Sequence, residues 1–128
     1  MAALAALAAI SPSTAGGWAE ACAAQIGACP PELRGRVIAA AAWSAYFAGD
    51  VPLARRRAED ALQGRAAGDP ISLALLRMLL AQIYAVTGQP ERGASIARQA
   101  RQEAADLGIE ILVGYFHAEE SMALVAAA

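Results

Sequence analysis

A glycine-marked reversal in the stretch from Ile38 to Leu62, IAAAAWSAYFAGDVPLARRRAEDAL, constrains the fold more than any other feature of this chain. The pattern predicts a helix that ends at Gly49, a tight turn at Asp50-Val51-Pro52, and a second helix with small residues on its inner side. Glycine adopts the left-handed backbone that ends many helices, while a capping Asp followed by Pro is typical of a helix start. Because so short a turn forces its helices to lie side by side, the stretch predicts an antiparallel hairpin.

The same order of residues recurs along the chain. Ala67-Gly68-Asp69-Pro70 repeats the stop, the glycine, the capping Asp and the proline, and Thr87-Gly88-Gln89-Pro90 turns the chain again. Gly108 begins a last helix, in which Gly114 is the weak point. We therefore expect an all-α fold of about six to seven helices. Their expected ranges are 2–10, 18–28, 32–48, 51–65, 70–86, 90–107 and 109–127.

Composition favours the same fold class. Hydrophobic residues make up 58% of the chain, but aromatic residues make up only 5%, and alanine supplies the difference. Alanine is the best helix former because it loses no side-chain entropy on entering a helix. The β-branched residues are scattered and do not alternate with polar ones over a useful window, so no strand is expected.

The charge excludes some classes of function. The net charge is −2, the pI is about 5.3, and every basic residue is Arg. Binding to a nucleic-acid backbone needs a positive face that releases counterions, and this chain offers none. Without lysine there is neither a Walker-type phosphate loop nor a Schiff-base lysine.

The cysteines and the apolar segments predict a cytoplasmic protein. Cys22 and Cys29 are seven residues apart, which in a helix separates their Cα atoms by about 10 Å, beyond disulfide reach. We interpret them as small buried residues in a reducing compartment. The segment Met1 to Ile10 lacks the basic start of a signal peptide, and Arg77 with Gln82 interrupts the longest candidate for a membrane span.

Two units of the pattern align when Gly49 is placed on Gly88, an offset of 39 residues (88 − 49). Small residues then match before and after the turn, where they would let two helices approach to the short end of the usual spacing of about 8–10 Å. The matched pairs are Ala42 with Ala81, Ala54 with Gly93, Ala58 with Ala97, and Ala61 with Ala100; larger residues beside them are Tyr46, Tyr84, Leu62 and Leu80.

These small residues and glycines resemble the tetratricopeptide repeat, over roughly residues 34–107. The longer period and the Gly-Asp-Pro at 68–70 are more similar to the degenerate repeats of large bacterial LuxR-type, ATP-dependent transcriptional regulators. In that family such repeats sense ligands or partners, and this chain has no sequence for the ATP- or DNA-binding domains. The resemblance implies one helical-repeat domain, with an N-terminal hairpin (1–30), two units (31–67 and 68–107) and a terminal helix (108–128).

The resemblance also implies a partner-binding groove on the first helix of each unit. In the first unit it would present Arg36, Trp43 and Phe47, and in the second Met78 and Gln82. Trp43 and Phe47 are four residues apart and share a helix face, and an aromatic pair beside Arg suits a peptide anchor. The alternative is that this pair simply packs against the N-terminal helices, to which Trp18 also belongs.

Other polar clusters have simpler interpretations. Arg55-Arg56-Arg57 could clamp an acidic partner, but Glu59 and Asp60 follow at i,i+4 and predict a solvated face. His117 and Glu120 lie one helical turn apart and, with Glu119, form the only cluster with acid-base potential. We interpret these as surface or groove-lining polar residues, because there is no second His and no HExxH motif.

The sequence thus favours a binding module over an enzyme, with no catalytic residues, metal site or cofactor expected. The first hypothesis is a scaffold that binds a protein or peptide, with no direct contact to nucleic acid or membrane. The alternative is a helical bundle that dimerises through its Ala-rich terminal helices. The apolar final segment MALVAAA fits a longer array, a self-association surface, or a helix tucked against the preceding hairpin.

Overall fold

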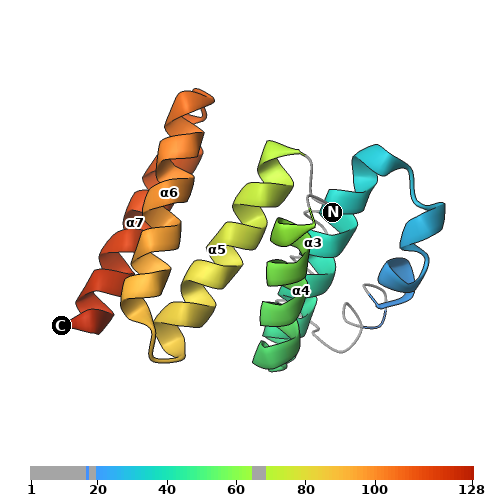
Figure 1. Cartoon of the computed structure of the whole chain (residues 1–128), viewed down its shortest axis with the longest axis horizontal. Coiled ribbons are helices and arrows are strands. Elements are labelled where there is room, and N and C mark those ends of the chain that lie inside the picture. The colour runs from blue at the N-terminus through green and yellow to red at the C-terminus, as the bar shows by residue number, and fades with distance from the viewer. Residues whose placement is uncertain (1–16, 18–19, 65–68) are drawn as a thin grey trace. The chain divides into compact units, whose positions relative to one another are not determined.

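The protein has an all-α fold (Figure 1). A computed structural model describes residues 17, 20–64 and 69–128, and within these ranges there is no strand. The expected helix at 2–10, the place of Trp18 and the Ala67-Gly68 turn lie outside the described residues. The elements are η1 (Ile26–Ala28), α3 (Pro31–Phe47), α4 (Val51–Gln63), α5 (Pro70–Val86), α6 (Pro90–Asp106) and α7 (Glu110–Ala127).

From α3 onward, each helix that the sequence predicts is present. The helix expected over 18–28 is the exception, because its described part is helical only at 20–24, turns at Gln25, and continues as the 3-10 helix η1. This ending leaves Cys22 exposed and Cys29 half-buried, both as free thiols. The interpretation of the cysteines as buried residues was therefore wrong for Cys22.

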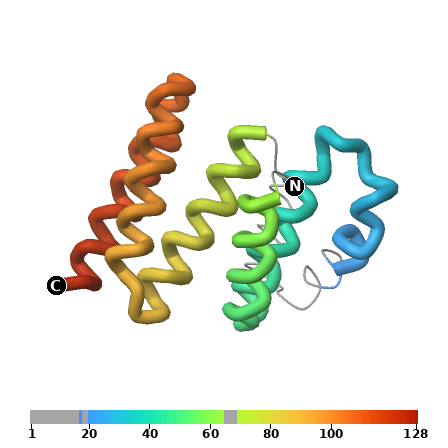
Figure 2. The backbone as a smooth tube through the Cα atoms, viewed as in Figure 1, coloured from blue at the N-terminus to red at the C-terminus, as the bar shows by residue number. Residues whose placement is uncertain are grey.

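Three glycines end helices in the same way. Gly49, Gly88 and Gly108 have φ angles of 86°, 83° and 71°, in the left-handed region that favours glycine. At Gly49, its N–H donates to Tyr46 O (3.0 Å) and the next N–H donates to Ala45 O (2.9 Å), which is the Schellman arrangement. Gly108 makes the equivalent pair of bonds. The predicted reversals at Gly49 and Gly88 are confirmed, and the connections 48–50, 87–89 and 107–109 are equally short (Figure 2).

The small residues predicted for the inner side of the helices are buried. The alanines at the matched positions, from Ala42 and Ala81 to Ala61 and Ala100, are at most 4% exposed. Gly93, which is matched with Ala54, is buried as well. Gly93 shows why size matters, because a Cβ added there would lie 2.7 Å from the carbonyl oxygen of Ala81. The backbones of α5 and α6 therefore approach so closely at this point that only glycine, which has no side chain, fits at position 93.

Two compact units make up the chain, Met1–Leu76 and Arg77–Ala128, and the boundary falls inside α5. In the first unit α3 packs against α4, and Arg57 Nη1 of α4 donates to the carbonyl oxygen of Ala41 at 3.1 Å. In the second unit α6 packs against α7. Its largest fully buried side chains are Tyr84 and Phe116, together with Leu79 and Ile83. The core of the second unit thus contains a few large buried side chains in addition to the contacts between small residues.

Aspartates cap two helices, as the sequence predicts. The Asp50 side chain accepts from Leu53 N–H (3.0 Å) at the start of α4, and Asp69 accepts from Ser72 N–H (2.9 Å) at the start of α5. Asp69 also accepts from the Ser72 hydroxyl. Burial raises the pKa of Asp69, but the bonds from Ser72 and the charge of Arg36 outweigh it, so that the pKa falls below 3.8.

Replacing Asp69 with Asn should remove a pH-dependent part of the stability. A carboxylate with a lowered pKa in the folded state stabilises the fold above the unfolded pKa, and this contribution is lost as the pH falls through the folded value. Since Asn also caps helices, we expect Asp69→Asn to cost about 0.5 kcal/mol at neutral pH and less at about pH 3, which lies below the unfolded pKa. Urea unfolding at both pH values measures this, with Asp60→Asn as an exposed control. An equal cost at both pH values would contradict the assignment.

Candidate partner-binding site

Three aromatic rings form a cluster on the last two turns of α3. The Trp43 and Phe47 rings are stacked, with centroids 5.6 Å apart and an interplanar angle of 29°. Tyr46 meets both edge-on, at 5.9 Å from Trp43 and 5.9 Å from Phe47. The spacing of three and four residues along a helix brings these rings together. We call Trp43, Tyr46 and Phe47 the aromatic cluster.

The cluster has one fixed end and one open end. Trp43 is half-buried, and its indole N–H donates to the carbonyl oxygen of Leu75 at 3.0 Å. Phe47 is the last residue of α3 and is 39% exposed. The C-cap Ala48 and the turn at Gly49 follow it directly. The arrangement presents a ring to solvent on a support that is already ordered.

Arg36 lies on the same face of α3, seven residues before Trp43, and is exposed. Its positive charge lowers the pKa of Asp69, after the larger effects of burial and of the Ser72 hydrogen bonds. Arg36 thus adds a cation to the face that carries the aromatic cluster.

The remaining predicted groove residues lie in the second unit, and their surroundings differ from the expectation. Met78 is only 8% exposed and belongs to the core. Gln82 is half-buried, and its side-chain amide donates to Glu119 Oε1 of α7 at 2.9 Å. The helical spacing of residues along α5 shows which of them share a face, but it does not show whether that face lines a groove or is covered by another helix.

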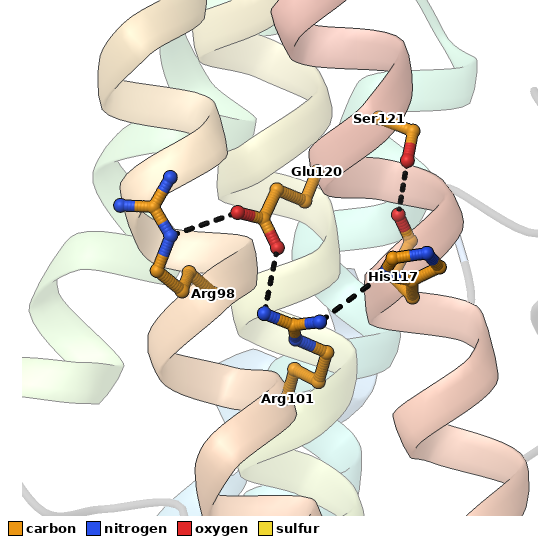
Figure 3. Close-up of polar contacts among 5 residues, drawn as sticks. All are labelled: Arg98, Arg101, His117, Glu120 and Ser121. Carbon is orange, nitrogen blue, oxygen red and sulfur yellow. Dashed lines mark hydrogen bonds and ion pairs between the residues drawn. The ribbon is translucent and has the colours of Figure 1, made fainter.

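A second polar arrangement joins α6 and α7 (Figure 3). Glu120 accepts from Arg98 Nε at 2.8 Å and pairs with Arg101 Nη2 at 3.2 Å. Arg101 Nη1 also lies 3.1 Å from His117 Nδ1, which must be the acceptor because a guanidinium only donates. Ser121 Oγ donates to the carbonyl oxygen of His117 within α7.

These contacts correct the interpretation of the α7 acids. Glu119 and Glu120 are 5% and 8% exposed, so they are not surface residues, whereas His117 is exposed as expected. A useful signal was available in the sequence, because Arg98 and Arg101 share one face of the preceding helix and could neutralise a buried acid. The arrangement ties two helices together. In the described ranges, no three His, Cys, Asp or Glu side chains are grouped as they would be to hold a metal ion.

The arginine run on α4 is divided between different contacts. Arg55 Nε pairs with Glu59 Oε1 at 3.0 Å, as the i,i+4 spacing predicts. Arg57 instead binds Glu20 and the backbone of α3. Part of the run is therefore structural and joins α4 to its neighbours in the first unit.

No protein-family model, curated protein or solved structure matches this chain. Among the described helices, none is both long and apolar enough to cross a membrane. The aromatic cluster of α3 combines an exposed ring, Phe47, with a stacked and hydrogen-bonded support, Trp43.

Proposed function

We propose that this protein is a helical-repeat scaffold that binds a protein or peptide partner through the aromatic cluster of α3. One observation carries the proposal, namely that the open ring of Phe47 rests on a supporting ring pair held by the hydrogen bond from Trp43 to Leu75. Aromatic side chains dominate the energetics of binding surfaces because each one buries a large area and loses few rotamers.

The neighbouring charge suggests the chemistry of the partner. Arg36 is exposed on the same helix face, and guanidinium groups bind carboxylates in a defined geometry. A peptide with an apolar side chain for Phe47 and an acidic residue about three helical turns away, matching the 11 residues (47 − 36) between Phe47 and Arg36, would bind both. The ordered support reduces the entropy lost on binding, which favours affinity.

The wider role follows from the resemblance to tetratricopeptide-like repeats. Matched glycine turns and buried small residues at the same offset support a repeat of this type. We propose that the chain serves in the cytoplasm as the sensor or interaction part of a bacterial transcriptional regulator. The acidic net charge supports a role without direct nucleic-acid contact.

The proposal predicts which residue a bound peptide needs. Peptides selected from a displayed random library against the whole chain should lose about 30-fold in affinity when Phe47 is changed to Ala, as expected for an aromatic anchor. Isothermal titration calorimetry measures the change. Val86→Ala is the matched control, because Val86 ends α5 as Phe47 ends α3 and is 67% exposed.

Three results would overturn the proposal. The first is a selection that yields no binding peptide. The second is a set of peptides that bind the Phe47→Ala and wild-type proteins equally, and the third is an equal loss in Val86→Ala. Circular dichroism of both variants should show unchanged helicity, because each residue is exposed at a helix end.

A further inference from the structure

The outer face of α7 carries an apolar stripe that no described helix covers. Its members are all exposed, and Ile111 and Val125 reach 82% and 77%. They follow one another at intervals of four, three, four and three residues, which is the spacing of a coiled-coil seam. We call this set the α7 stripe: Ile111, Tyr115, Ala118, Met122 and Val125.

Charge is nearly absent from this face. Two of the three acids of α7, Glu119 and Glu120, are buried and bind Gln82, Arg98 and Arg101, so only Glu110 is exposed, in the first turn. Burial, followed by the nearby Glu119 charge, raises the pKa of Tyr115 above 10.0, so its hydroxyl stays neutral. A charged partner would find only Glu110 and the exposed His117 of α7 to pair with, whereas an apolar face with little charge of its own would fit.

The stripe is complementary to itself. Ile111 and Val125 each lie seven residues from Ala118, so a two-fold axis at Ala118 places Ile111 of one copy against Val125 of the other. Tyr115 then lies beside Met122 of the other copy, and the small Ala118 lets the helices approach at the centre. This antiparallel pairing also separates the two Glu110 carboxylates by most of a helix of about 27 Å, whereas parallel pairing would place them together.

We propose that two copies of this chain pair through the α7 stripe, antiparallel, around a two-fold axis at Ala118. One helix face is smaller than the roughly 800 Å² per partner that stable interfaces bury. The dimer is therefore weak, with a Kd on the order of 10 µM, and its population depends on protein concentration.

Sedimentation equilibrium of the whole chain between about 1 and 200 µM tests the pairing. The wild type should pass from monomer to dimer, and Ile111→Glu and Val125→Glu should each weaken the dimer at least about 10-fold, since each buries a carboxylate in an apolar seam. Val86→Glu is the matched control, because it adds the same charge to an exposed aliphatic residue outside the stripe and should leave the dimer unchanged.

Cysteine cross-linking tests the direction, in a background where Cys22 and Cys29 are changed to Ser. Ala118→Cys should oxidise readily to a linked dimer, because the axis brings the two copies of this position together. Ile111→Cys alone should not, but adding Val125→Cys should restore the link. A chain that stays monomeric throughout the range overturns the proposal, even if its stripe captures another protein or a lipid vesicle. Two other results also overturn it. One is cross-linking of the Ile111→Cys variant when the Ala118→Cys variant does not cross-link, and the other is a dimer that neither Glu variant weakens.

Discussion

Replacing Gly93 with valine should destabilise the protein by about 3 kcal/mol and lower its Tm by about 10 °C. A Cβ at this position would lie 2.7 Å from the carbonyl oxygen of Ala81 and 3.3 Å from the backbone nitrogen of Ala85. Both atoms belong to the backbone of α5, so no side chain can rotate away to make room. Gly93→Ala should also destabilise, by less, because alanine's better helix propensity offsets about 1 kcal/mol of the clash.

Gly114 provides the matched control, because it also lies inside a helix but a Cβ there meets nothing within 4 Å. Gly114→Ala should therefore stabilise the protein by about 1 kcal/mol. Urea unfolding of both alanine variants compares the two positions directly. If Gly93→Ala proved as stabilising as Gly114→Ala, the close approach of α5 and α6 at Gly93 would be wrong.

Changing Glu120 to Gln should cost about 2 kcal/mol, the value of hydrogen bonds made by a buried charged group. Glu120 binds two arginines of α6 at 2.8 and 3.2 Å, and the neutral amide would leave Arg98 and Arg101 as neighbouring cations without their shared counter-charge (Figure 3). Thermal and urea unfolding measure the loss.

Glu110→Gln removes the same charge from the same helix, but at an exposed position in the first turn. Its favourable interaction with the helix end is worth only a few tenths of a kcal/mol, about 0.3 at this exposure. Similar losses in the two variants would show that Glu120 contributes no more than a surface charge.

The sequence predicted the parts of the fold that depend on local chemistry. A glycine with positive φ followed by a capping residue and proline specifies where a helix ends and the next begins, so the helix bounds after residue 31 are nearly right. The buried positions of Ala54, Ala58 and Ala97 followed from the same alignment, since a hairpin this tight must place small residues between its helices.

The candidate site was predicted only in part, because its surroundings depend on contacts that are distant in sequence. Spacing placed Trp43 and Phe47 on one face, but it gave no sign of the indole bond to Leu75. Likewise, the residues next to Gln82 in the sequence do not show whether its side chain lines a groove or binds Glu119, which is 37 residues away. Glu120 looks like a solvated acid until Arg98 and Arg101 of the neighbouring helix are placed beside it.

The alanine-lined contact surfaces also affect how stability varies with temperature. Burying alanine freezes no side-chain rotamers, so these helices associate without the ordering cost that leucine or methionine would carry. Each contact also re-exposes little apolar surface when the chain unfolds, and the heat-capacity change of unfolding scales with that surface. A small heat-capacity change flattens the stability curve, so a protein built on such contacts keeps a similar folding free energy over a wide thermal range.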